Sequence, residues 1–150
     1  MFRHIPCMLS DLTKRDHLHI MQIGMLDYLQ KWIFHLMKTH KQLHKYNAIW
    51  LSMPAYHDLT AKNKSYEEVS QWNGKEMKEM SQYLLGVVTQ SLQGGSPAQC
   101  PIFNRAMNCT RALLEFYMYA RYKPHDDATL TYMEDALDRF PTYQDVFLLR

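Results

Sequence analysis

Two histidines, His40 and His44, lie four residues apart in a stretch that we expect to be helical. On a helix this spacing places both imidazoles on one face, where they could chelate a zinc ion. No glutamate lies between them in an H-E-x-x-H arrangement, and the sequence shows no evident third ligand. We therefore do not predict a zinc site at this pair.

Asp16 and His19 form a second pair of chemically capable residues. An imidazole three positions from a carboxylate can orient that carboxylate or bind a metal ion. Both residues also have ordinary interpretations, because an Asp just before an amphipathic helix caps its free amides and a His one turn later is a common neighbour. The pair alone leaves both interpretations open.

The segment 38–45 is mildly basic and contains Lys38, Lys41 and Lys45. Such a face could contact the phosphates of DNA, or it could simply be solvated. Trp50 and Trp72 could stack on unpaired bases, but aromatic side chains at the end of an apolar stripe usually belong to a core. We favour the core for both tryptophans.

The composition describes a chain that can bury one sizeable core. It has 150 residues, of which 47% are hydrophobic, and one domain is the default for this length. The formal net charge is only +2, from 17 Lys and Arg against 15 Asp and Glu. This balance is far weaker than that of a dedicated nucleic-acid binder, so charge alone implies no partner.

The three cysteines, Cys7, Cys100 and Cys109, show no C-x-x-C spacing, and no secretory signal accompanies them. This pattern favours an intracellular, reducing compartment over a disulfide framework. The most apolar stretch, 20–37, is interrupted by several polar residues and is too polar for a membrane span. We expect a soluble protein without a membrane partner.

Helical spacing of apolar residues dominates the chain, and no alternating pattern typical of strands competes with it. Ser65 with Glu68 predicts a capping box, Asp126 or Asp127 predicts a helix start, and Pro141 predicts a helix end. The fold class that we expect is an all-α multi-helix bundle with long amphipathic helices. The expected helices cover 16–44, 47–53, 65–72, 77–92, 101–122 and 126–140.

Several blocks of sequence occur in a recognisable order. They are Asp16-His17-Leu18-His19 followed by Gly24, Leu29 and Trp32, then 70–77, 83–86, 111–116 and 131–137. Together they resemble fungal Plavaka-type transposases, which are relatives of the CACTA group. The resemblance covers 16–150, a helical transposase-like segment, whereas 1–15 matches poorly.

The resemblance implies a nuclease of the DDE class, in which carboxylates hold two Mg²⁺ or Mn²⁺ ions for phosphodiester chemistry on DNA. The matching catalytic positions are Asp16, His19 and Glu76, with Asp16 and Glu76 as metal ligands. Arg15 stands where the family usually has a proline, so the sequence departs from the family pattern directly before Asp16. The family also implies a nuclear location.

The resemblance further implies that this chain is the helical insertion and C-terminal helical part of an incomplete RNase H-like core. We expect the sheet with the first catalytic Asp to lie upstream, so the chain alone should be inactive. The alternative is a non-catalytic helical module that binds DNA through 38–45 or protein through exposed apolar helix faces. A degenerate reading frame is the third possibility.

Overall fold

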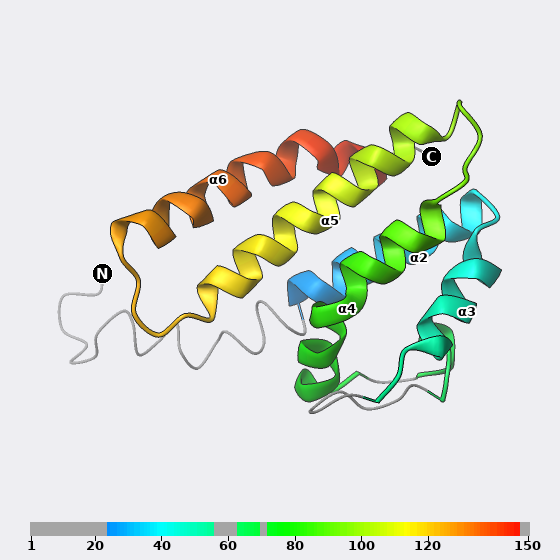
Figure 1. Ribbon diagram of the computed structural model, residues 1–150, viewed down its shortest axis with the longest axis horizontal. Coiled ribbons are helices and arrows are strands. Elements are labelled where there is room, and N and C mark those ends of the chain that lie inside the picture. Colours follow the sequence, from blue (N-terminus) through cyan, green and yellow to red (C-terminus); the bar gives the residue numbers. More distant parts are fainter. Residues whose placement is uncertain (1–23, 56–62, 70–71, 148–150) are drawn as a thin grey trace, which may run out of the picture.

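The computed structural model describes residues 24–55, 63–69 and 72–147 (Figure 1). Within these ranges the chain forms five α-helices and no β-strand, which confirms the predicted all-α fold. The elements are α2 (Leu26–Thr39), α3 (Leu43–Ser52), the 3₁₀ turn η2 (Tyr66–Glu68), α4 (Gly74–Leu92), α5 (Cys100–Ala120), α6 (Asp127–Gln144) and the 3₁₀ turn η3 (Asp145–Phe147).

The helices pack in a consistent order across the molecule. α5 and α6 run side by side in opposite directions as a long hairpin (Figure 1). α4 packs on the other side of α5 and also contacts α3, while α2 contacts α3, α4 and η3. The hairpin therefore rests on a smaller group of three helices, and η3 joins its end to α2.

The core follows the apolar stripes that the sequence predicts. On α2 and α4 the buried apolar residues recur every three or four positions, which is the period of one helix face. α5 contributes Phe103, Leu113 and Tyr117 from the opposite side. The stripe residues are Leu26, Leu29, Ile33, Leu36 and Met37 on α2, and Met77, Met80, Leu84, Val87 and Val88 on α4.

The expected helix over 16–44 is wrong at its end, because α2 stops at Thr39 and α3 begins at Leu43. Lys41 adopts a left-handed backbone with φ of 57°. The amide of Lys41 donates to the oxygen of Lys38 at 3.2 Å, and the amide of Gln42 donates to that of Met37 at 2.8 Å. These two bonds form a Schellman-type cap, which satisfies the free carbonyls of α2 while reversing the chain. The start of the expected helix, at 16–23, lies outside the described residues.

Two smaller predictions are also wrong. The expected helix over 65–72 is only the short turn η2, although its predicted capping box between Ser65 and Glu68 is confirmed. Pro141 does not end the last helix, which continues to Gln144. A proline has no amide hydrogen, so the carbonyl four residues before it loses its helical donor. Pro141 is exposed, and water can donate to that carbonyl instead. Arg105 of α5 also donates to the oxygen of Thr142 at 2.9 Å, which holds this last turn on the hairpin.

The remaining predicted helices are confirmed, although the helix predicted over 47–53 is α3, which begins at Leu43. The segments 77–92 and 101–122 correspond to α4 and α5, and Asp126 caps α6 by accepting from the amide of Thr129 at 2.8 Å. In the part of the chain that the structure describes, no helix combines the length and the apolar character needed to cross a membrane.

Candidate nucleic-acid interface

The turn between α2 and α3 brings the three candidate DNA-binding lysines to one corner of the molecule. Lys38 lies in the last turn of α2, Lys41 forms the left-handed residue of the turn, and Lys45 lies in the first turn of α3. We call this region, 38–45, the basic corner.

Two of these lysines have no charged partner among the described residues. The ammonium group of Lys45 donates to the backbone oxygen of Gln93 at 2.6 Å, just beyond the end of α4. Lys38 and Lys41 are both exposed, and neither forms an ion pair with any described residue. Lys45 therefore has a structural role, while Lys38 and Lys41 present unneutralised charge to solvent.

Two histidines lie within the basic corner. The ring of His40 packs edge-on against Phe103, with 5.2 Å between ring centroids and an angle of 87°. His44 is exposed on the first turn of α3. The contact of His40 holds the corner against α5. Among the described residues no group of three or more His, Cys, Asp or Glu side chains is arranged to hold a metal ion.

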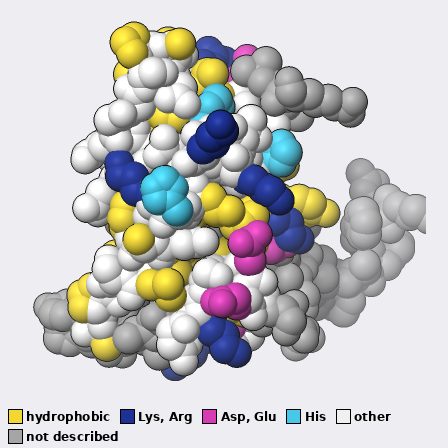
Figure 2. Space-filling view, turned by 90° about the vertical axis from the view of Figure 1, so that its right-hand side faces the viewer, with side chains coloured by type: hydrophobic (Ala, Val, Ile, Leu, Met, Phe, Trp, Pro, Cys, Tyr) yellow, Lys and Arg dark blue, Asp and Glu magenta, His cyan; other side chains and the backbone are white. Residues whose placement is uncertain are grey.

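Figure 2 views the molecule from the side of the turn between α2 and α3. Lysine, arginine and histidine side chains gather across the middle of this face, with acidic side chains below them.

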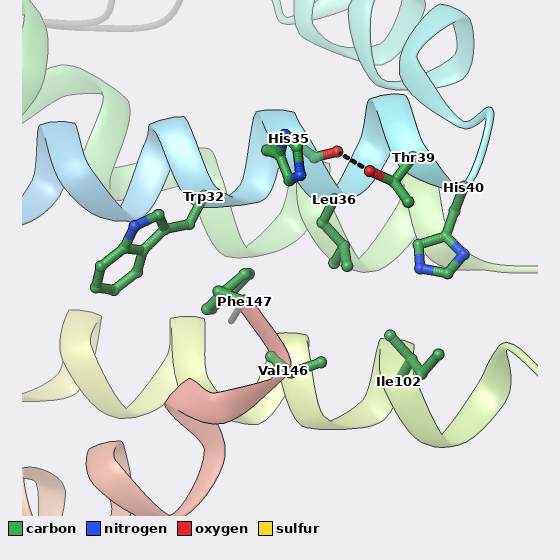
Figure 3. Close-up of a pocket in the computed structure, with 8 residues that line it drawn as sticks. All are labelled: Trp32, His35, Leu36, Thr39, His40, Ile102, Val146 and Phe147. Carbon is green, nitrogen blue, oxygen red and sulfur yellow. Dashed lines mark hydrogen bonds between the residues drawn. The ribbon is translucent and has the colours of Figure 1, made fainter. Parts of the chain in front are cut away.

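A cavity beside the basic corner is too small for a nucleotide or a cofactor. It lies between α2, α5 and η3 and measures about 30 Å³, enough for about two water molecules. In Figure 3 the hydroxyl of Thr39 donates to the backbone oxygen of His35 at 2.9 Å and so is already engaged. The lining residues are Trp32, His35, Leu36, Thr39, His40, Ile102, Val146 and Phe147.

The structure places Glu76, the expected metal ligand, in the first turn of α4, where it caps the helix. Its carboxylate accepts from the amide of Asn73 at 3.0 Å, and the side chain of Asn73 accepts from the amide of Glu76 at 3.0 Å. This reciprocal pair is a capping box. Asp16 and His19, the other expected catalytic residues, lie outside the described residues. The described part of the chain therefore does not provide a fit for Mg²⁺ or Mn²⁺.

The two tryptophans belong to a cluster of aromatic side chains, and the core interpretation is confirmed for Trp50. Trp50 is fully buried, and its indole donates to the backbone oxygen of Lys64 at 3.2 Å. Trp72 is partly buried and stacks on Tyr66 with 5.3 Å between centroids. Burial also raises the pKa of Tyr66 and of Tyr83, which packs edge-on against Trp50. The cluster stabilises the packing of α3 on α4, and Trp50 has no face available for a base.

No family model matches the chain, and comparisons with curated proteins and with solved structures find no match.

The site is therefore described by its own geometry. The basic corner offers the ammonium groups of Lys38 and Lys41, which can bind phosphate oxygens as point charges, and the exposed ring of His44, which can donate a hydrogen bond. Sequence analysis found the lysines but missed the contacts that shape the corner, those of Lys45 with Gln93 and of His40 with Phe103. Both contacts join segments far apart in the chain, and no local pattern signals them.

Proposed function

We propose that the chain is a helical DNA-contacting part of a Plavaka-type transposase, and that its basic corner binds the phosphate backbone. The observation that carries this proposal is the pair Lys38 and Lys41. Lys38 is exposed in the last turn of α2, Lys41 is exposed within the turn that follows, and neither has an acidic partner among the described residues. The order of the sequence blocks supports the family, and the free lysines support the contact with DNA.

The proposed contact is electrostatic and independent of base sequence. Lysine ammonium groups bind phosphate oxygens as point charges, whereas base reading requires bidentate side chains in a groove. Two phosphate contacts release about two counterions. The basic corner should therefore contribute about 2 to the slope with which the logarithm of affinity falls against the logarithm of salt concentration. Binding by the chain alone should therefore be weak and salt-sensitive.

The proposal assigns phosphodiester chemistry with Mg²⁺ or Mn²⁺ to the complete transposase. Among the described residues no group of three or more His, Cys, Asp or Glu side chains is arranged to hold a metal ion, and the Glu76 carboxylate caps α4. This same observation favours the alternative in which the chain is a non-catalytic helical DNA-binding module. Both versions require that the basic corner binds DNA. A nuclear location is part of the proposal in both.

The test measures the binding of a labelled DNA duplex by fluorescence anisotropy between about 50 and 200 mM salt. The double variant Lys38→Ala/Lys41→Ala should weaken binding and reduce the salt slope by about 2. The matched control, Lys78→Ala/Lys123→Ala, removes the same charge from exposed positions outside the corner. Equal losses in both double variants, or no binding by the unmodified chain at low salt, would contradict the proposal.

A further inference from the structure

α6 forms the outer layer of the hairpin and buries little of its own surface. Ala136 is its one buried residue along 18 positions. α6 is held on α5 by the ion pair of Arg139 with Glu115 at 2.6 Å and by stacking of Tyr132 on Tyr119 with 5.6 Å between centroids. Both contacts lie on one flank of α6. In Figure 1 no other described helix runs along the outer side of α6.

The opposite flank carries an apolar stripe made of Leu130, Leu137 and Pro141. Leu130 is 46% exposed and Leu137 is 41% exposed. The two leucines are separated by two helical turns, so they lie on the same side of α6, and the exposed Pro141 continues the row. Single exposed leucines are ordinary, but two leucines and a proline in one row, on a helix that packs mainly against α5 and η3 among the described elements, form a candidate docking face.

An acidic row of Asp127, Glu134 and Asp138 runs along the solvent side of the apolar stripe. These side chains lie within about a quarter turn of the leucines around the helix axis. All three are exposed, and none forms an ion pair with a described residue. Arg139 is the one basic residue of α6, and Glu115 already neutralises it on the other flank.

The charge of this row selects among the possible occupants. A second copy packed through the same flank would place the two acidic rows against each other, and like charges brought together at an interface are destabilising. DNA is repelled for the same reason. A helix that presents leucines with lysines or arginines beside them would bury the apolar stripe and neutralise the acidic row together.

We propose that this flank of α6 is a docking site for a basic amphipathic helix of a protein partner. The apolar stripe supplies the buried contact, and the acidic row supplies orientation and the choice of partner. The site is independent of the basic corner, which lies at the turn between α2 and α3 and carries the opposite charge.

The experiment uses the full chain and two synthetic helical peptides of about 18 residues. The first has leucines every three or four positions with lysines beside them, and the second has glutamate in place of each lysine. Calorimetric titration should show the basic peptide binding at least about tenfold more tightly than the acidic one, and more weakly as salt rises. Equal binding of both peptides, or binding of neither, overturns the proposal.

Three variants locate the binding. Leu130→Ala/Leu137→Ala should weaken binding of the basic peptide about tenfold, whereas Leu51→Ala, at a leucine that is 43% exposed on α3, should leave it unchanged. Glu134→Gln/Asp138→Asn keeps the apolar stripe and should reduce the preference for the basic peptide. Insensitivity to these double variants would overturn the site.

Two further measurements separate the remaining outcomes. Lys38→Ala/Lys41→Ala should leave peptide binding unchanged, so failure of the DNA proposal and failure of this one remain distinguishable. Sedimentation should show that the chain does not dimerise through α6. Dimerisation lost in Leu130→Ala/Leu137→Ala would assign the flank to a second copy and overturn the proposed partner.

Discussion

The ammonium group of Lys45 lies 2.6 Å from the backbone oxygen of Gln93 and joins the start of α3 to the end of α4. A cation at a helix C-terminus neutralises the partial negative charge of the free carbonyls there. One of the three lysines in the basic corner is therefore part of the fold. The remaining two are the ones available to a ligand.

Replacing Lys45 with methionine should lower the free energy of unfolding by about 0.5–1 kcal/mol, because the aliphatic stem remains while the hydrogen bond and the charge are lost. Urea unfolding followed by circular dichroism measures the change. Lys123→Met is the matched control, since Lys123 is exposed and no hydrogen bond or ion pair joins it to a described residue. Equal stability of the two variants would mean that the contact with Gln93 contributes nothing.

Lys41→Gly should raise the free energy of unfolding by about 0.5–1 kcal/mol. The backbone of Lys41 lies in the left-handed region, where a Cβ atom is unfavourable and glycine is not. Lys38→Gly is the control, because Lys38 lies within α2 and glycine there costs about 1 kcal/mol. Thermal unfolding of both variants should give shifts of opposite sign. A loss of stability in both would contradict the capping role of Lys41.

This turn also shows where sequence reasoning failed. The residues Lys38 to Lys41 include neither glycine nor proline, and the apolar stripe continues to Leu43, so local pattern favours one helix. The break is stabilised instead by packing of α3, whose Tyr46 and Trp50 are fully buried in the core. Non-local burial outweighed local propensity, as it commonly does.

The sequence was informative where the signal was local. The apolar stripe of α4 and the cap of α6 depend on residues a few positions apart. The stripe was predicted correctly, and of the two predicted cap residues, Asp126 and Asp127, the structure uses Asp126. The lysines of the basic corner were visible as a run, but the division of roles among them depends on Gln93, which is distant in the chain. The expected site residues Asp16 and His19 remain predictions, because they lie outside the described residues.

The reciprocal pair of Asn73 and Glu76 predicts different effects for two substitutions. Asn73→Ala should lower the free energy of unfolding by about 1 kcal/mol, because the amide of Glu76 loses its acceptor. Glu76→Gln should change stability little, since the glutamine oxygen can still accept from the amide of Asn73. Urea unfolding compares the two variants. Equally large losses would mean that the charge of Glu76 is essential to the cap.

Glu76→Gln also tests the catalytic part of the proposed function. The proposed function implies no DNA cleavage with Mg²⁺ or Mn²⁺ by this chain alone, because two-metal chemistry needs several carboxylates around a metal pair. The one expected metal ligand among the described residues, Glu76, caps α4. In a complete transposase, Glu76→Gln should abolish cleavage while leaving thermal stability unchanged if Glu76 is a metal ligand. Robust cleavage by the chain itself that disappears in Glu76→Gln would contradict the expected inactivity and support the site.

Glu115 makes the hairpin of α5 and α6 sensitive to acid. Its carboxylate accepts from Arg139 at 2.6 Å and from Arg111 at 2.7 Å. Burial alone would raise the pKa of Glu115, but the two guanidinium groups outweigh it and hold the pKa below the ordinary 4.5. A carboxyl whose pKa is lower in the folded state stabilises the fold above the unfolded pKa, and this contribution is lost as pH falls through the folded value.

Glu115→Gln should therefore lower the free energy of unfolding at pH 7 by about 0.2–1 kcal/mol, the usual range for exposed ion pairs. The difference from the unmodified chain should shrink as pH falls below 4.5 and vanish once Glu115 is protonated in the folded state. Urea unfolding across this pH range measures the difference in the free energy of unfolding. Glu134→Gln is the control, because Glu134 is exposed and forms no ion pair with a described residue. A difference that stays constant down to acid pH would show that packing of the side chain, rather than its charge, joins the two helices.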